Sequence, residues 1–586
     1  MKRRRFNFLV FTLLLTLIFG GCSSSSNNEQ ADGTASPKPS QENTQAAEGS
    51  VNPEPLGKYE TPIDISFVRS FGEVPSQNRL TTEGNEFIQF VEDQLGIRIQ
   101  YKWVSNNDQY PQKLSLMLSS GDLADVMLVD MKTMYQMIDA GQVEPLTDAW
   151  NNYGDELTKK LMNPEGMSGF QMATQDETLY GIPLTQPALE TMHALFLRED
   201  WRVRLGLPEP KTMADLEKIM YAYANDDPDN NGKKDTYGIV LSKDLYDVAA
   251  EISSISNAYR AYPSAWIEKD GKIVYGSVQP EMKTSLGKLQ QWFKDGLIDQ
   301  EFTVKNSDKA MEIIAKNQAG AVFGVQWTQF ISSAISGQWA SDPNSDWKLY
   351  PIPSADSEAA KPYIKDNTQQ FIVVRKGFEH PEAIVKLLNL MHKLGAGDAR
   401  DLLPTLDEFN MIWDGKLKDT GGNWTFMPLT PETMHGNVEK WKAVNKALAS
   451  GDESLVEGNY NQLQVYRGIK KYNDEGGADI RKNGTTEQLE DAKGAWGTQF
   501  SGRLFGIADE LDKQGNLQID KRGPFVSQTM VDTKATLEKR ELETFTRIIT
   551  GDAPLDEFDE FVKQWNQLGG EQTTKEINDW YNETVR

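Results

Sequence analysis

Residues 62–69, PIDISFVR, decide the fold class, because their apolar residues alternate with polar ones. The two isoleucines and the phenylalanine would lie on one face of a β-strand, where successive side chains point to opposite faces. The segment 97–103, IRIQYKW, repeats this alternation, and 125–130, DVMLVD, is an apolar run of strand length. The sequence therefore predicts three strands in the first part of the folded chain.

Helical patterns separate these strands. Residues 85–95 place apolar side chains on one helical face and are followed by Gly96, and a second helix is expected near 112–119, before Gly121. Because strand and helix alternate, we expect an α/β fold with parallel-rich sheets.

Two later segments predict core helices. Residues 381–392 form an apolar run that begins with a proline, which suits the first turn of a helix. Large apolar residues recur at helical spacing before Gly569-Gly570, at Leu555, Phe558, Val562, Trp565 and Leu568.

Length and charge limit the function. A chain of 586 residues is too long for one ordinary core and suits two lobes or more. Eighty-six acidic residues against 61 basic ones give a formal net charge of −25, so nucleic acid is not expected as a partner. The same charge would be repelled by anionic lipid, so electrostatics cannot hold the protein on a membrane.

The N-terminus has the order of a secretory signal, with basic residues at 2–5, an apolar run at 8–19 and then small residues. Cys22 is the only cysteine in the chain, which excludes internal disulfides and cysteine zinc sites. FGGC at 19–22 resembles the bacterial lipobox, with phenylalanine in place of the usual leucine. We expect a signal peptide over 1–21 and lipidation of Cys22; the alternative is a stray thiol.

Residues 23–57 contain almost no large apolar side chains, so 22–57 is expected to be a lipidated, flexible tether. The lipid would hold the mature protein on the extracellular face of the cell membrane. The long serine-rich tether and polybasic signal resemble those of Gram-positive lipoproteins.

The segment 227–235, DPDNNGKKD, has the spacing of the first part of an EF-hand calcium loop. Side-chain oxygens would come from Asp227, Asp229, Asn231 and Asp235, and Lys233 would offer its backbone carbonyl. The glutamate expected at the twelfth position is absent. We expect a structural calcium ion here, and the alternative is a solvated turn.

Several passages together resemble family 1 of the extracellular solute-binding proteins, the sugar-binding components of ABC importers. They occur in family order at 116–127, 140–147, 179–184, 195–212, 227–239, 294–302, 320–327, 380–389 and 558–582.

The resemblance implies a type II periplasmic-binding-protein-like fold, in which two lobes close around a ligand cleft by hinge motion. The first lobe would hold 58–182 and about 372–445, and the second 183–371 and about 446–586. The hinge crossings are expected at 180–183 and at 367–374. The implied partners are a carbohydrate and the permease subunits of an ABC importer, and the implied state is a monomer.

Candidate ligand-binding residues come from two arguments. Trp327 and Gln326 end the passage GAVFGVQW, which resembles the family stretch that carries a cleft tryptophan for stacking on sugar; for Trp327 the alternative is a core side chain. Arg69 and Asp130 end predicted strands, where ligands of open α/β sheets bind, although a surface arginine and a helix cap are equal alternatives. Gln186 follows the first hinge crossing.

Tyr262 and Trp266 lie with Tyr259 in an aromatic loop that could line the cleft or simply pack.

Two other functions stay open at this point. A secreted glycoside hydrolase or lyase would need a pair of carboxylates, which 86 acidic residues could always supply. A chemoreceptor or scaffold lipoprotein would bind ligand without import. The ligand is expected to be an oligosaccharide, and a peptide is the alternative. A uronate-rich oligosaccharide would need local Arg or Lys, for which Arg69 is a candidate.

Overall fold

The structure is a computed structural model that describes residues 52–71, 74–162, 169–185, 188–365, 368–397, 399–413, 423–429 and 435–584. Contacts divide the chain into residues 1–50 and residues 51–586, and only the second unit contains described residues. Within the described part, no helix is long and apolar enough to cross a membrane.

The first sheet has the strand order β2-β1-β3-β13-β6. Its bounds are β1 Ile63–Phe71, β2 Ile97–Asn106, β3 Val126–Val129, β13 Thr368–Val374 and β6 Ile182–Thr185. Strand β1 pairs in parallel with β2 and β3, whereas β13 runs antiparallel to both β3 and β6. The three strands expected from the sequence are confirmed, and their observed bounds differ from the expected ones only by a few residues at the ends.

Helices α1 (Glu86–Leu95) and α2 (Tyr110–Ser120) connect these strands as the sequence predicts. The side chain of Asn85 accepts hydrogen bonds from the backbone of Phe87 and Ile88, which caps α1. Gly96 ends α1 at a φ of 68°, where glycine meets no Cβ penalty. Local signals therefore place β1, α1 and β2 in order.

The second sheet is smaller and has the order β10-β7-β11, with β7 Ala194–Arg198, β10 Ala321–Gly324 and β11 Trp347–Tyr350. Both neighbours run antiparallel to β7, so the parallel pairing expected from the sequence holds for β1, β2 and β3 of the first sheet and not for this one. Side chains on both faces of β7 are buried, with Leu195 and Leu197 in one apolar cluster and Ala194 and Phe196 in another. This burial explains why the strand is continuously apolar.

Strands β6 and β13 are adjacent where the chain leaves the first sheet, and the hinge crossings at 180–183 and 367–374 stay a prediction. Residue 367 lies outside the described part. From β6 the chain continues through η2 (Ala188–Thr191) into β7, and β12 (Tyr363–Ile364) precedes β13. Two neighbouring connections therefore join the elements of the two sheets.

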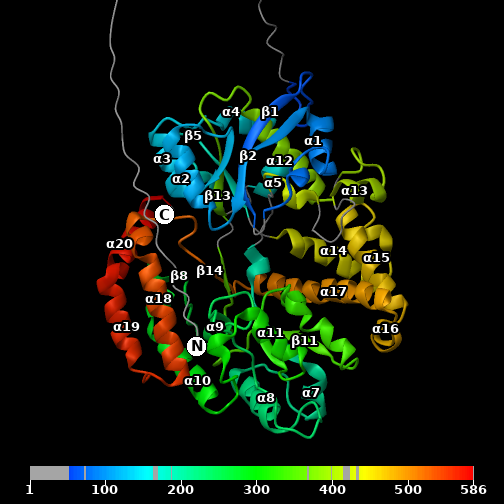
Figure 1. Cartoon of the computed structure of the whole chain (residues 1–586), viewed down its shortest axis with the longest axis vertical. Coiled ribbons are helices and arrows are strands. Elements are labelled where there is room, and N and C mark those ends of the chain that lie inside the picture. Colours follow the sequence, from blue (N-terminus) through cyan, green and yellow to red (C-terminus); the bar gives the residue numbers. More distant parts are fainter. Residues whose placement is uncertain are drawn as a thin grey trace, which may run out of the picture. The chain divides into compact units, whose positions relative to one another are not determined.

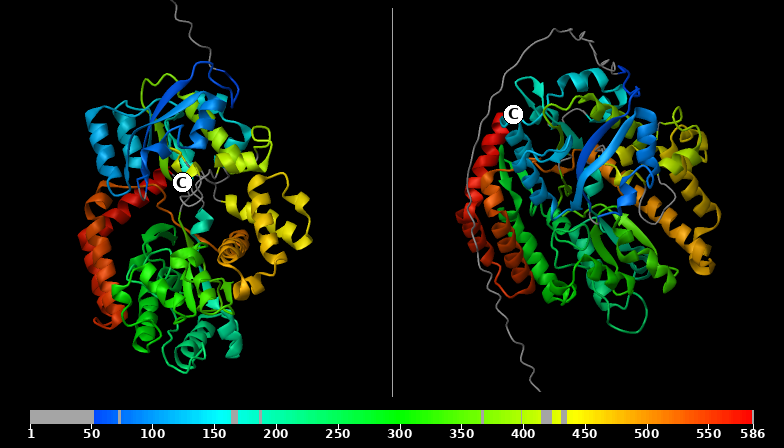
Figure 2. Two further views of the ribbon diagram at one scale, coloured as in Figure 1. Left: turned by 45° about the vertical axis from the view of Figure 1, so that its right-hand side comes forward. Right: turned by 45° about the horizontal axis from the view of Figure 1, so that its top comes forward.

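Figure 1 shows helices of the second half of the chain on two sides of these elements. One group is α14 Gly436–Ser450, α15 Tyr460–Asp474, α16 Gly477–Asn483 and α17 Thr486–Lys513; the other is α18 Gln528–Thr550, α19 Glu557–Trp565 and α20 Glu571–Thr584. Both further views keep the groups apart (Figure 2). Helix α14 packs on α15 and α17, although the expected boundary near 445 would cut through it.

The two expected core helices appear as α12 (Glu382–Gly395) and α19. Nearly every side chain of α12 is buried, which confirms its core role. Helix α19 passes into a π-helical turn at Asn566–Gly570, where Gly569 has a φ of 121°. This turn rotates Leu568 outward, so the expectation that it is a core residue is wrong: it is 45% exposed.

Candidate ligand-binding site

The carboxyl ends of β1, β2 and β3 share one edge of the first sheet because these strands are parallel. Arg69 lies near the end of β1, opposite Val104, and its side chain is only partly exposed. Asp130 directly follows β3. The structure therefore brings these two predicted residues to the edge at which open α/β sheets bind ligands.

Aromatic side chains that the sequence analysis did not single out surround Arg69. Its guanidinium carbon lies 4.8 Å from the ring centroid of Phe71, which is 6.4 Å from that of Phe426. The hydroxyls of Tyr101 and Tyr110 donate hydrogen bonds to the backbone oxygens of Phe426 (2.6 Å) and Leu128 (3.0 Å). Burial raises the pKa of both tyrosines, and the charge of Arg69 opposes this rise.

Asp130 is exposed and caps α3 (Met131–Asp139), because its Oδ1 accepts a hydrogen bond from the backbone of Thr133 at 2.7 Å. This is the capping role that the sequence left open. Its other carboxylate oxygen takes no part in this cap, and a role in ligand binding stays a prediction.

Trp327 follows the end of β10 and is partly exposed, as a stacking platform requires. The neighbouring Gln326 is also partly exposed, and its backbone oxygen accepts a 2.7 Å hydrogen bond from the hydroxyl of Ser501 in α17. Buried Gln329 donates to the same hydroxyl at 2.7 Å. These contacts fix the loop after β10 while leaving part of the indole ring open.

Tyr262 and Trp266 are buried, with 5% and 7% of their surface exposed. The ring of Trp266 packs against those of Tyr275 and Trp565, at centroid distances of 5.1 and 6.4 Å. In this structure Tyr262 and Trp266 therefore belong to a packed loop, which was one of the two alternatives for this segment. The sequence could not show this, because Trp565 lies far along the chain. Gln186 and Cys22 lie outside the described residues.

The segment 227–235 folds into a tight loop after α8 (Met213–Asn225). Asp227 accepts hydrogen bonds from the backbone of Asn231 and Gly232, each at 2.9 Å. The side-chain nitrogen of Asn231 donates to Asp229 (2.8 Å) and to Asp235 (3.1 Å). The carboxylates of Asp229 and Asp235 therefore converge on one amide group.

Charges within this loop are only partly balanced. Asp229 Oδ1 is buried and has no hydrogen-bond partner. Burial, together with Asp227 and Asp235, raises the pKa of Asp229. Burial acts in the same direction on Asp227, but hydrogen bonds from Gly232 and Asn231 outweigh it and lower the pKa of that carboxyl.

Oxygen donors of this kind suit calcium, and the unpartnered Oδ1 is an atom that a cation would satisfy. In the side-chain arrangement of the structure, however, no group of three His, Cys, Asp or Glu residues in the described ranges has the geometry of a metal site. The residues thus fit calcium in type, and binding would require Asn231 to turn its oxygen inward.

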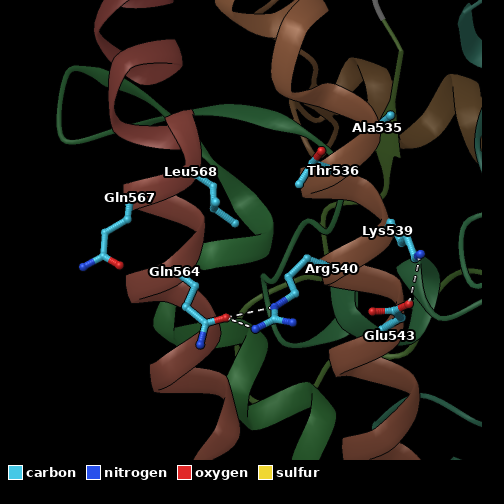
Figure 3. Close-up of a pocket in the computed structure, with 8 residues that line it drawn as sticks. All are labelled: Ala535, Thr536, Lys539, Arg540, Glu543, Gln564, Gln567 and Leu568. Carbon is cyan, nitrogen blue, oxygen red and sulfur yellow. Dashed lines mark hydrogen bonds and ion pairs between the residues drawn. The ribbon is translucent and has the colours of Figure 1, made fainter.

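A groove lies elsewhere, between α18 and the α19–η10 segment, and encloses about 750 Å³ (Figure 3). Arg540 Nε donates a 2.9 Å hydrogen bond to Gln564 across it. No aromatic ring lines it, so it lacks a platform for a sugar. A second hollow of about 370 Å³ lies beside the proline-rich segment 351–353. Neither contains a predicted site residue.

Comparison with known families decides the identity of the chain. The family described as "Bacterial extracellular solute-binding protein" matches residues 78–393, which is more than half of the chain. The chain belongs to this family of extracellular solute-binding proteins. The resemblance found in the sequence and the two-lobe fold class that it implied are confirmed.

Individual relatives of this solute-binding protein are distant. Lipoprotein LipO of Bacillus subtilis is 21% identical over 499 residues, which cover 84% of this chain and 88% of LipO. The fructooligosaccharide ABC transporter substrate-binding protein FusA of Streptococcus pneumoniae is 25% identical over 229 residues, or 36% of this chain and 41% of FusA.

Solved structures agree on the fold. A human-milk-oligosaccharide ("HMO") binding solute-binding protein of Bifidobacterium longum infantis has a TM-score of 0.54 at 17% identity, covering 89% of this chain and 99% of that chain. An EF-hand mutant of FusA in complex with fructo-nystose gives the same TM-score at 16% identity, covering the same shares of the two chains.

Proposed function

We propose that this solute-binding protein captures an oligosaccharide between the strand ends of its two sheets and delivers it to an ABC importer. The observation that carries the proposal is the pairing of two kinds of group at those ends. Trp327 offers a partly exposed ring after β10, and Arg69 offers hydrogen-bond donors near the end of β1. A sugar presents apolar C–H faces and a rim of hydroxyls, which match such groups.

The relatives support the ligand class and the role. FusA is named for fructooligosaccharide and for an ABC transporter, and the solute-binding protein of similar fold from Bifidobacterium longum infantis is named for "HMO" binding. Family membership favours capture over hydrolysis. The proposed lobes hold residues 58–182 with about 372–445, and 183–371 with about 446–586. Because α14 packs on α15 and α17, the boundary proposed near 445 fits better at the start of α14, at Gly436.

For the location, we propose an extracellular, membrane-anchored lipoprotein that acts as a monomer and carries its lipid on Cys22. The lipobox-like FGGC supports this proposal, and so does the name of LipO. Globomycin treatment of the expressing cells tests it, since blocking the lipoprotein signal peptidase should leave an unprocessed precursor. Cys22→Ser should release the protein or leave it unprocessed.

For the loop at 227–235, we propose a structural calcium ion held by Asp227, Asp229, Asn231 and Asp235 and by the backbone oxygen of Lys233. Support comes from the unpartnered Asp229 oxygen and from the EF-hand that the FusA title mentions for that protein. The ion would tie the end of α8 to the following segment and would take no part in ligand chemistry.

Thermal melting of residues 58–586 against a panel of oligosaccharides, monosaccharides and peptides tests the proposed function. A ligand that binds only the folded state raises the melting temperature by mass action. We expect a rise with oligosaccharides and an unchanged sugar on chromatography. Cleavage products, or a rise with peptides alone, would contradict the proposal.

A further inference from the structure

Apart from the ring of Phe71, the guanidinium of Arg69 has no hydrogen-bond or ion-pair partner in the part of the chain that the structure describes. Its Nη1 is buried and makes no hydrogen bond, and none of the described carboxylates forms an ion pair with it. Burial lowers the pKa of Arg69, and only the neighbouring Tyr101 and Tyr110 oppose this effect. A buried charge without a partner costs free energy, so the position calls for an explanation.

The composition of the chain makes this lack of an acid informative. Acidic residues outnumber basic ones by 86 to 61, so a carboxylate could readily have been placed beside Arg69. Arg198, at the end of β7, shows such pairing: its Nε lies 2.8 Å from Asp200 and its Nη2 lies 2.8 Å from Asp342. The Arg69 site instead contains rings and hydroxyl groups.

The surroundings of Arg69 would strengthen its attraction for an anion. Phe71, Tyr101 and Tyr110 exclude water from one side of the guanidinium, and a lower local dielectric increases the interaction between charges. Both tyrosine hydroxyls already donate their hydrogen atoms to backbone oxygens. The guanidinium is therefore the group in this cluster that still has hydrogen-bond donors to offer.

An anion can reach the residue, because the Arg69 side chain as a whole is partly exposed at the ligand-binding edge. Nη1 itself gains a partner only if an acceptor replaces the atoms that now cover it. A carboxylate matches the planar fork of a guanidinium and can bind it through two hydrogen bonds.

We infer that the oligosaccharide carries an acidic sugar unit, a uronic acid, whose carboxylate binds Arg69. This inference rests on the proposed function and adds the substrate class. The strand-end aromatic rings would contact the C–H faces of the sugar, and Arg69 would neutralise its charge. The net charge of −25 would otherwise disfavour an anionic ligand, so such a ligand needs a cation at the binding edge, which Arg69 supplies.

Paired ligands test the inference by titration calorimetry on residues 58–586. The probes are the trisaccharides of galacturonate, mannuronate and glucuronate, each beside its carboxyl-reduced neutral counterpart, with a set of neutral fructo- and galacto-oligosaccharides. We expect at least one acidic probe to bind at least about 30-fold more tightly than its reduced counterpart. Equal binding, or binding of neutral sugars alone, would overturn the inference and leave the proposed function standing. If no carbohydrate binds, the proposed function itself fails.

Variants then connect the preference to the residue. Arg69→Met should lose the preference for the acidic probe, by about 30-fold or more in Kd, and Arg69→Lys should retain part of it. Arg98→Met is the matched control, because this substitution changes the net charge by the same amount. Arg98 lies on β2, is exposed and forms a 3.0 Å ion pair with Asp64. The melting temperature of ligand-free Arg69→Met should not fall. A lower melting temperature with an unchanged acidic preference would show a structural role and overturn the inference.

Discussion

Two arginines at strand ends, Arg69 on β1 and Arg198 on β7, have opposite surroundings. Both lie over aromatic rings, with guanidinium carbons 4.8 Å from Phe71 and 4.4 Å from Trp201. Arg198 is fully buried and makes ion pairs with two aspartates, whereas Arg69 is partly exposed and has no such pair among the described residues. The difference separates a group that completes the scaffold from one that is available to a ligand.

Neutralisation explains why Arg198 can be buried. Asp200 and Asp342 balance its charge, and Asn317 accepts a further hydrogen bond. Its backbone oxygen accepts a 2.6 Å hydrogen bond from Tyr223, so the side chain and the backbone are both fixed. No such network surrounds Arg69 in the described residues, and its burial is favourable only when a ligand supplies the missing charge.

The largest expected effect is the loss of stability when Arg198, the arginine with two ion pairs, is replaced. Arg198→Met would leave Asp200 and Asp342 without their cation, so we expect a loss of about 3 kcal/mol in the free energy of unfolding. Urea denaturation measures it. Arg69→Met is the reference, and its free energy of unfolding should not fall; equal losses for the two variants would remove the distinction between them.

The calcium loop extends the comparison to an unpartnered anion, Asp229. At calcium concentrations about 100-fold above Kd, we expect about 2.7 kcal/mol of added unfolding free energy, which chelation removes. Asp229→Asn should lose this response, and in chelator it should be at least as stable as the parent, because Asp227 and Asp235 no longer repel it. Asp226→Asn, at the C-cap of α8, should keep the response. Calcium-independent melting would leave the loop a plain turn.

Glu541 of α18 represents a third case, a buried acid that only neutral donors contact. Tyr246, Ser277 and Tyr275 donate hydrogen bonds to it, the latter two at 2.7 and 3.0 Å. Burial raises its pKa from 4.5 to about 7, against those bonds and with help from Glu538.

The sign of the pH effect follows from this shift. Between pH 4.5 and about 7 the folded state holds a proton that the unfolded chain has lost, so stability falls as pH rises. From about pH 5 to about pH 8 we expect the parent to lose about 2.5 kcal/mol relative to Glu541→Gln, as measured by urea denaturation. Parallel pH profiles of the two proteins would contradict this account.

The smallest effect tests whether the second sheet contributes to binding. Trp327→Ala should weaken oligosaccharide binding by about 2 kcal/mol, or about 30-fold in Kd, because the sugar loses its stacking surface. Tyr221→Ala, which removes an exposed ring on α8, should leave Kd unchanged. Equal affinities for the parent and Trp327→Ala would confine the ligand to the first sheet.

The sequence predicts the first sheet well because its signals are local. Alternation in 62–69 and a glycine after 85–95 are enough to position β1 and α1. The antiparallel second sheet could not be predicted in the same way, because β7, β10 and β11 are separated by long insertions.

Long-range contacts limited the prediction of the site. Arg69 and Trp327 could be proposed from strand ends and a family passage, but the rings around Arg69 include Phe426, which only the fold brings to β1. The residue type of Trp266 suits a sugar-stacking platform, but its ring is buried and packs against that of Trp565. Side chains that contact partners hundreds of residues away leave no local pattern in a single sequence.

Hydrogen exchange with and without a bound oligosaccharide tests the central claim most directly, because it shows where the ligand lies. The account predicts slower exchange at 66–71, 101–110 and 324–330, the ends of β1, β2 and β10 with the loops that follow them. Exchange in the groove between α18 and α19, at 535–568, should not change. Protection of that groove, with the three strand ends unchanged, would contradict the account.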